Sequence, residues 1–118
     1  MFYLGAACHL IQDATVPQHV NNKLLKSHRK FELWIISKLM TDYSFDAQEG
    51  IIKYDEIQDF IVNNAIMAND IYLKTINIKT GKRYAKIATT IIHEAQRTTA
   101  GFLLFFYEEM NVKNKILL

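Results

Sequence analysis

Few residues in this chain break helices or cross-link distant segments. The 118 residues include one proline, four glycines and one cysteine, Cys8. A single cysteine excludes an intrachain disulfide framework, and the scarcity of turn-forming residues argues against an all-β fold. The net charge is only +2, and the basic residues are spread along the sequence, so charge alone does not indicate nucleic-acid binding.

Long hydrophobic runs are also absent. The longest uncharged apolar stretch near the C-terminus covers about residues 98–107, roughly half of the ~20 residues that a membrane-spanning helix needs. The apolar start, residues 1–8, has no basic stretch and leads directly into His9 and Asp13, which is not typical of a signal peptide. We therefore expect either a cytoplasmic protein or a chain that begins partway through a longer one.

Hydrophobic residues make up half of the chain and recur every three or four positions, the period of an amphipathic helix. The predicted helices cover about residues 2–13, 27–39, 55–76 and 82–111, with a loop over 42–50. The last helix is either continuous or bent at Gly101. No internal repeat or linker divides the chain, so the sequence predicts one all-α domain.

Several conspicuous side chains are expected to be structural. Aromatic residues at helical spacing are typical of a core, which applies to Trp34, Phe102, Phe105, Phe106 and Tyr107. His93 is expected to be a partly exposed helix residue rather than a metal ligand. Cys8 is expected to be a small buried residue.

Two histidine–carboxylate pairs carry the chemical signal. His9 and Asp13 are four residues apart on one predicted helix, and His28 and Glu32 repeat this spacing on the next, so each pair shares a helix face. His19 lies in the connection between them. Imidazole nitrogen and carboxylate oxygen are ligands that zinc accepts at about 2.0–2.2 Å. Either pair alone is more typical of a local hydrogen bond, but both pairs with the loop histidine favour a metal site if the two helices pack side by side.

The same residues resemble a known family. Residues 2–19, reading FYLGAACHLIQDATVPQH, resemble the central motif of the zinc-dependent phospholipase C family, in which a histidine, an aspartate, a proline and a second histidine have this spacing. His28 and Glu32 resemble its next motif, a histidine followed four residues later by a glutamate. Residues 96–102, reading QRTTAGF, resemble its last helix with a threonine–alanine–glycine step.

The resemblance implies an all-α multi-helix bundle, of the type shared by phospholipase C and the P1 nuclease, with up to three zinc ions. His19, His28 and Glu32 would complete the protein ligands of one zinc ion. His9 and Asp13 would serve a second, and Asp13 would bridge to a third. The implied reaction is attack of a zinc-bound hydroxide on the phosphorus of a phospholipid head group, and the implied partner is a phospholipid or membrane surface. Members of the family are typically secreted.

Several features of the family pattern are missing from this chain. The other ligands of the second and third zinc ions, and the expected general base, lie upstream of the motif, so no catalytic residue beyond the metal ligands is assigned here. Gln12 stands where the family usually has a glycine. We therefore expect residues 1–118 to form the C-terminal part of a larger catalytic domain, with one nearly complete zinc site. Helices made to pack on a missing half, or on a second copy of the chain, would expose apolar surface.

Two other functions remain open. A single-strand nuclease of the S1/P1 type shares the spacing of the first motif, but Glu32 and the nine-residue step from His19 to His28 favour the phospholipase. A truncated, non-catalytic zinc-binding module would bind the metal without turnover.

Overall fold

The structure is a computed structural model that describes residues 2–17, 28–41 and 44–117. Within these ranges it has four α-helices: α1 (Phe2–Asp13), α3 (His28–Leu39), α4 (Ile57–Lys74) and α5 (Thr80–Leu117). These ranges contain no β-strand. The prediction of an all-α fold is confirmed, and each helix lies within a few residues of its predicted bounds except for the longer C-terminal end of α5.

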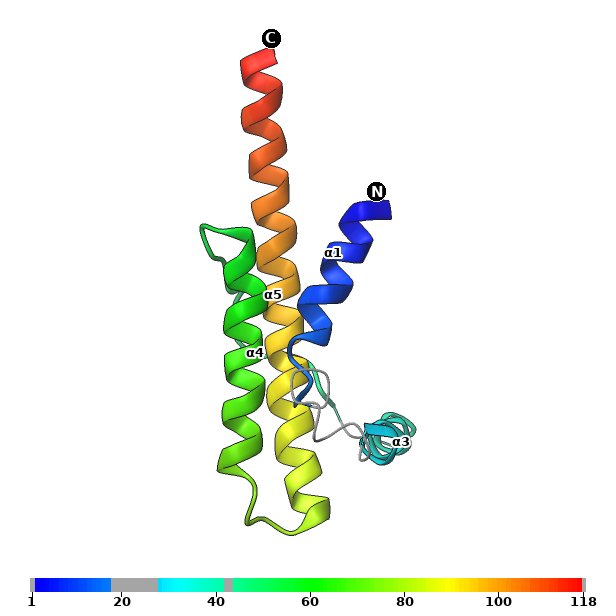
Figure 1. The fold of residues 1–118 in the computed structure, drawn as a ribbon. Coiled ribbons are helices and arrows are strands. Elements are labelled where there is room, and N and C mark those ends of the chain that lie inside the picture. Colours follow the sequence, from blue (N-terminus) through cyan, green and yellow to red (C-terminus); the bar gives the residue numbers. More distant parts are fainter. Residues whose placement is uncertain (1, 18–27, 42–43, 118) are drawn as a thin grey trace.

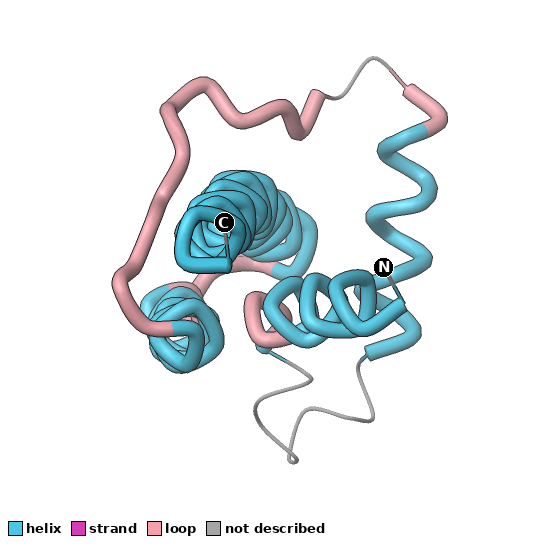
Figure 2. Tube along the Cα trace, turned by 90° about the horizontal axis from the view of Figure 1, so that it is seen from above, coloured by secondary structure: helices cyan, strands magenta, loops and turns pink. Residues whose placement is uncertain are grey.

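The long helix α5 is the axis of the molecule. Its 38 residues extend about 57 Å at 1.5 Å per residue, which matches the 58 Å length of the whole structure. Figure 1 shows α4 beside the lower part of α5, α1 on the other side, and α3 crossing nearly end-on to the view. Seen from above, the other elements surround α5, whose end is marked C (Figure 2). Every part of the fold is therefore positioned by this one helix.

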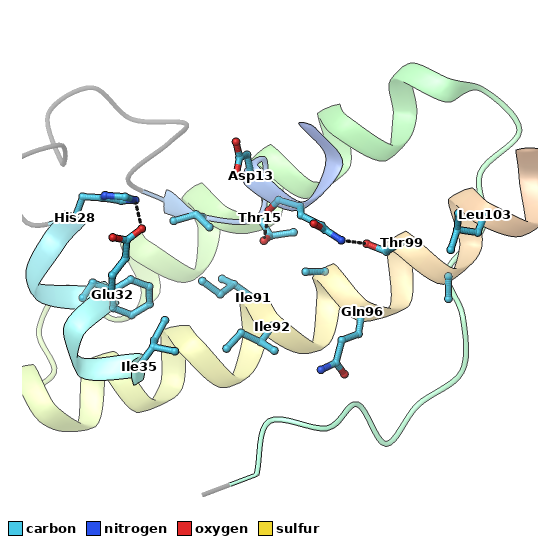
Figure 3. A pocket seen from close by; sticks show the side chains of 15 residues that line it. Asp13, Thr15, His28, Glu32, Ile35, Ile91, Ile92, Gln96, Thr99 and Leu103 are labelled. Atoms are coloured by element: carbon cyan, nitrogen blue, oxygen red, sulfur yellow. Dashed lines mark hydrogen bonds and ion pairs between the residues drawn. The ribbon is translucent and has the colours of Figure 1, made fainter. Parts of the chain in front are cut away.

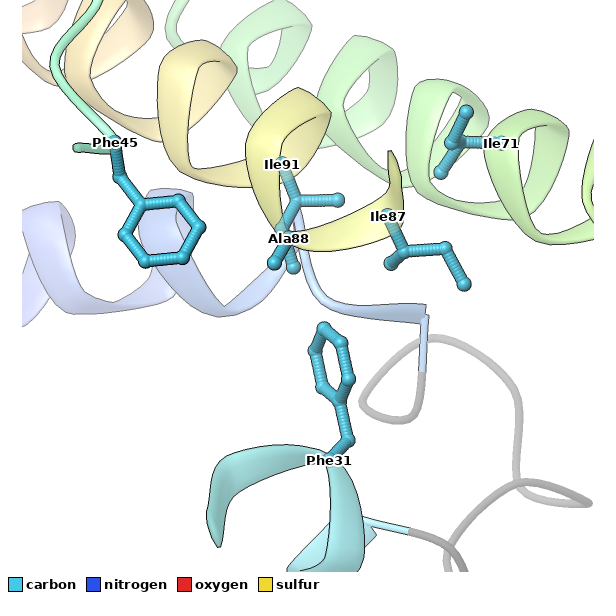
Figure 4. Close-up of a cluster of buried hydrophobic side chains, with 6 residues drawn as sticks. All are labelled: Phe31, Phe45, Ile71, Ile87, Ala88 and Ile91. Atoms are coloured by element: carbon cyan, nitrogen blue, oxygen red, sulfur yellow. The ribbon is translucent and has the colours of Figure 1, made fainter. Parts of the chain in front are cut away.

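Two clusters of buried side chains hold the helices on α5. The first, shown in Figure 4, consists of Phe31, Phe45, Ile71, Ile87, Ala88 and Ile91. It joins α3, the 44–56 segment and α4 to α5. The second consists of Ile11, Phe60 and Phe102 and joins α1 and α4 to α5. Each cluster buries the apolar stripe that the helical period predicted.

The predicted core aromatics divide into two groups. Trp34 packs against the first cluster with its ring 5.9 Å from that of Tyr84, and Phe102 and Phe105 belong to or contact the second. These predictions are confirmed. The prediction was wrong for the other two: Phe106 is 37% exposed and Tyr107 is 63% exposed. The cause is that α5 runs past the ends of its neighbours at this point (Figure 1).

Gly101 does not bend α5, which continues through it without a break. The segment before α4 passes across the helix at this position, where the Ile52 amide donates a hydrogen bond to the Arg97 carbonyl at 3.1 Å. A Cβ atom on residue 101 would lie 1.6 Å from the Ile52 carbonyl oxygen. Only glycine therefore permits this close approach of the two backbones.

Polar side chains of α5 bind the 44–56 segment, which is not helical before α4. Gln96 accepts a hydrogen bond from the Ala47 amide at 2.7 Å and donates one to the Phe45 carbonyl at 3.2 Å. Arg97 donates to the Gly50 carbonyl at 2.8 Å. These contacts confirm the predicted loop for residues 44–50, and they satisfy backbone groups that a loop cannot pair internally.

Considerable apolar surface is exposed, as the sequence led us to expect. The largest exposures are those of Phe2, Tyr3, Met40, Ile66 and Tyr107. Among the helices that the structure describes, none combines the length and the hydropathy that crossing a bilayer requires.

Candidate metal centre

The first histidine–carboxylate pair lies at the C-terminal end of α1. His9 Nε2 is 3.1 Å from Asp13 Oδ2, so the predicted contact across one helical turn is present. The side chain of His9 is 72% exposed, and that of Asp13 is 38% exposed. Asp13 is the last residue of α1, and its carboxylate is the more enclosed member of the pair.

The second pair lies in the first turn of α3. His28 Nε2 is 3.1 Å from Glu32 Oε1, and Phe31, between them in sequence, is buried in the first core cluster. The side chain of His28 is 26% exposed and that of Glu32 is 55% exposed, so the pair lies at the edge of this core. A helical turn with Phe31 directed into the core places His28 and Glu32 on an adjoining face.

A cavity of about 660 Å³ brings the second pair and the carboxylate of the first pair into one space. Asp13, His28 and Glu32 all line it (Figure 3). The rest of its wall is mostly apolar and comes from α3 and α5, with Ile35, Ile91, Ile92, Ala95, Ala100 and Leu103. The cavity therefore has carboxylate and imidazole groups toward one end, and the rest of its wall is mostly aliphatic with the polar side chains of Gln12, Thr15, Gln96 and Thr99.

The five predicted ligands are only partly assembled. His9 is not among the residues that line the cavity, and His19 lies outside the described residues. The described part of the chain contains no group of three or more histidine, cysteine or acidic side chains in metal-binding proximity. The helices α1 and α3 do not pack side by side, because α3 crosses the long axis (Figure 1). Asp13 and the second pair instead line the same cavity, where α1 ends and α3 begins.

The donor chemistry of both pairs fits zinc. Two ligand atoms at 2.0–2.2 Å from one tetrahedral zinc ion lie roughly 3.3–3.6 Å from each other. The nitrogen–oxygen separations of 3.1 Å in both pairs are close to this span. A small movement of each side chain would therefore give one zinc ion a nitrogen and an oxygen ligand from the same helix turn.

A buried asparagine fixes the end of α1 that carries Asp13. Asn64 of α4 donates hydrogen bonds to the Ile11 carbonyl at 3.0 Å and to Thr98 Oγ1 at 2.9 Å. Both Asn64 and Thr98 are fully buried, and Thr98 donates in turn to the Glu94 carbonyl at 2.7 Å. The sequence analysis missed Asn64. The available signal was an amide side chain on the apolar face of a predicted helix.

Gln12, next to Asp13, also contacts α5. Its Nε2 donates a hydrogen bond to Thr99 Oγ1 at 3.2 Å, and both residues line the cavity. The threonine–alanine–glycine step of residues 99–101 thus has a structural explanation. Thr99 binds α1, Ala100 lines the cavity, and Gly101 admits the crossing segment.

His93 and Cys8 are both only partly buried, as expected for His93, whereas Cys8 was expected to be buried. His93 is partly buried and does not line the cavity. Cys8 contacts the second core cluster, and burial raises the pKa of its thiol. A raised pKa disfavours the thiolate that would bind metal or act as a nucleophile.

Comparisons with known proteins identify the family of the chain. A family model described as zinc dependent phospholipase C matches residues 1–84, which include all five candidate ligands. A protein of Listeria monocytogenes named "Phospholipase C" is 28% identical over 131 aligned positions, covering 93% of this chain. The chain spans 44% of the length of that relative. No solved structure matches with significance. The matched region contains both histidine–carboxylate pairs and extends from α1 to the start of α5, and the chain belongs to the zinc-dependent phospholipase C family.

Proposed function

We propose that this chain is the C-terminal part of a zinc-dependent phosphodiester hydrolase that cleaves the head-group ester of glycerophospholipids. The observation that carries this proposal is the cavity, in which Asp13, His28 and Glu32 meet a hydrocarbon wall. The named relative, a phospholipase C, supports the same reaction class.

The candidate ligands divide between two ions. His19, His28 and Glu32 would hold one zinc ion, and His9 and Asp13 would supply ligands to a second. When bound, zinc lowers the pKa of a coordinated water to about 7 and polarises a phosphoryl oxygen. His28 and Glu32 can both act on one ion because their donor atoms are 3.1 Å apart.

The charged side chains that line the cavity indicate that an anionic substrate needs a cation to bind there. Asp13 and Glu32 place two carboxylates at the polar end, and no lysine or arginine stands among the described lining residues. A phosphodiester carries a further negative charge. Without a cation the anion and the carboxylates repel one another, so substrate binding at this end requires a metal ion.

The wall of the cavity favours a lipid over a nucleic acid. Sites for single-stranded nucleic acid combine a basic groove with exposed aromatic side chains on which bases stack. The described lining residues have no basic side chain and one aromatic residue, the buried Phe31. Aliphatic side chains such as Ile35, Ile92 and Leu103 fit glycerol carbons and acyl chains instead.

The proposed reaction is a hydrolysis. A bond forms between a water oxygen and phosphorus, and the bond from phosphorus to the glycerol oxygen breaks. The proton lost by water reaches the glycerol oxygen, which leaves as diacylglycerol, and the head group leaves as a phosphate monoester. We propose that Asp13, held by the contacts of α1, and Glu32, on α3, fix the positions at which phosphate and water are bound. Export from the cell is part of the same proposal, because the resemblance implies a secreted enzyme.

Zinc titration of the chelator-stripped chain tests the metal part. We expect His19→Ala to weaken zinc binding by at least 10-fold, in line with loss of one ligand, whereas His93→Ala leaves it unchanged. Absence of zinc binding by the unaltered chain would refute the proposal.

Turnover separates the alternatives. We expect zinc-dependent release of the phosphorylated head group from a choline lipid and no cleavage of single-stranded DNA. Cleavage of DNA alone would assign the chain to the S1/P1 nuclease type. Zinc binding with no turnover of either substrate would identify a metal-binding module without catalysis.

A further inference from the structure

The α4–α5 turn concentrates positive charge at one end of the molecule. The stretch of residues 73–86 contains five basic residues and no acidic one. They are Lys74, Lys79, Lys82, Arg83 and Lys86. This stretch contains the α4–α5 turn, which lies at one end of the α4–α5 hairpin, opposite the ends marked N and C (Figure 1). We call this end the basic tip. The sequence analysis described the basic residues as spread along the chain, whereas five of the 14 lie in this stretch.

Apolar side chains are exposed among these charges. Leu73 is 54% exposed and Ile76, in the turn itself, is 51% exposed. The turn is held from inside: Thr75 is fully buried and donates a hydrogen bond to the Ile71 carbonyl at 2.7 Å. The Ile78 amide donates to the Thr75 carbonyl at 3.0 Å. Because these hydrogen bonds fix the backbone of the turn, the side chain of Ile76 stays half-exposed at its surface.

One arginine is held in place at the tip by an aromatic ring. The guanidinium of Arg83 lies 4.6 Å from the centre of the Tyr72 ring, a cation–π contact. Lys79, Lys82 and Lys86 are exposed. Lys74 pairs with Asp70 at 2.6 Å, the nearest acidic residue in sequence. The tip therefore keeps a positive excess after its one ion pair is counted.

The opposite end of the molecule has the opposite charge. Residues 53–59, at the start of α4, include three carboxylates and one lysine, and residues 104–117 at the end of α5 include two glutamates and two lysines, so acidic residues exceed basic ones by two over these segments. Charge is thus separated along the 58 Å axis although the net charge is small. A field of this kind orients the molecule toward a negatively charged surface.

We propose that the basic tip docks the protein on an anionic lipid surface, with Ile76 inserted among the head groups and the lysines around it paired with lipid phosphates. Clustered lysines and arginines near an exposed apolar residue fit such a surface, to which each basic residue contributes by attraction. Exposed Arg29 and Lys30 on α3, in the same half of the molecule (Figure 1), add to this charge.

Docking at the tip would bring the cavity close to the lipid. Ile91, the first residue of α5 that lines the cavity, is nine residues beyond Lys82, or about 14 Å along the helix. The tip itself contains none of the candidate zinc ligands. The proposal therefore goes beyond the hydrolase function, and it can be tested with zinc removed.

Vesicle binding by the metal-free chain is the test. We expect binding to vesicles of equal phosphatidylcholine and phosphatidylglycerol, and much weaker binding to phosphatidylcholine alone. Raising salt from 0.1 to 1 M shortens the screening length from about 10 to about 3 Å and should weaken binding by at least 10-fold. Equal binding to both vesicle types, or no binding to the anionic ones, would overturn the proposal.

Matched charge variants localise the contact. We expect the double variant Lys79→Gln and Lys82→Gln to bind about 25-fold more weakly, at about fivefold per basic residue. Lys53→Gln with Lys113→Gln removes the same charge at the other end and should change binding by less than about twofold, because distant charges are screened. Equal losses in the two variants would show that only net charge matters and would refute docking by the tip.

The turn residue Ile76 provides a second, salt-independent readout. Ile76→Ser should weaken binding by about fivefold, because about half of an isoleucine side chain is available for burial, and this loss should persist in 1 M salt. If Ile76→Ser bound the vesicles as tightly as the unaltered chain, the proposed insertion of Ile76 would be refuted. Tighter binding of a single-stranded oligonucleotide through the same two lysines would assign the tip to nucleic acid instead.

Discussion

The close approach at Gly101 predicts a large effect from one methyl group. In Gly101→Ala the new Cβ would lie 1.6 Å from the Ile52 oxygen and 2.5 Å from the Ile52 carbonyl carbon. Both neighbours are backbone atoms, so no side-chain rotation relieves the clash. The crossing segment must move by roughly 2 Å to restore a normal contact.

The cost of that movement follows from the contacts that it breaks. Loss of the hydrogen bond from the Ile52 amide to the Arg97 carbonyl costs about 1 kcal/mol. Strain from overpacking adds about 1–3 kcal/mol. The higher helix propensity of alanine offsets about 1 kcal/mol of this loss in stability. We expect a net loss of about 2 kcal/mol in the free energy of unfolding, or about 8 °C in Tm.

Gly5→Ala is the matched control, because Gly5 is also within a helix but a Cβ there meets nothing within 4 Å. It should stabilise the chain by up to about 1 kcal/mol. Thermal and urea unfolding of both variants, with and without zinc, measure the difference. A Gly101→Ala variant as stable as the unaltered chain, or more stable, would refute the assigned role of Gly101.

Three further perturbations test other parts of the structure. Asn64→Ala should lower the free energy of unfolding by about 2 kcal/mol, because it leaves the buried Ile11 carbonyl without its partner, and it should also weaken zinc binding in a metal titration. Burial, followed by the nearby carboxylates of Glu94 and Asp59, raises the pKa of Tyr54 above its ordinary 10.0. The protonated phenol therefore stabilises the folded state fully below pH 10.0, and this contribution is lost as the pH rises through the folded-state pKa. In Tyr54→Phe, the free energy of unfolding measured in urea should therefore fall less steeply above pH 10.0. Zinc affinity should decline as the solution is acidified, since metal must compete with protons for its histidine ligands; calorimetry between pH 7.5 and 5 measures this, and a constant affinity would contradict histidine ligation.

Local patterns in the sequence were sufficient for the helices and for the two pairs. Apolar residues at a period of 3.6 predict a helix whatever it packs against, and α1 has the predicted bounds. The contacts of His9 with Asp13 and of His28 with Glu32 depend only on the geometry of one helical turn. Both are present at 3.1 Å.

Contacts between distant segments could not be predicted in this way. Asn64 reaches Ile11 and Thr98 only because α1, α4 and α5 meet. The sequence left open whether Gly101 bends the last helix, whereas the tertiary structure keeps the helix continuous and places a crossing segment against Gly101. Tyr107 is exposed because α5 extends beyond the ends of the neighbouring helices. This depends on the relative lengths of the helices, which a local sequence pattern does not contain. The ligand roles of all five residues stay predictions, and His19 lies outside the described ranges.

The central claim is that the two histidine–carboxylate pairs bind zinc at the cavity. X-ray absorption at the zinc edge, on the chelator-stripped chain reloaded with zinc, tests it most directly. We predict a shell of nitrogen and oxygen atoms at about 2.0–2.2 Å with imidazole scattering. Glu32→Gln should lower zinc affinity by at least 10-fold, whereas Glu49→Gln, at an exposed residue paired with Arg97, should not. A chain that takes up no zinc, a shell without imidazole, or equal affinity in both variants would contradict the account.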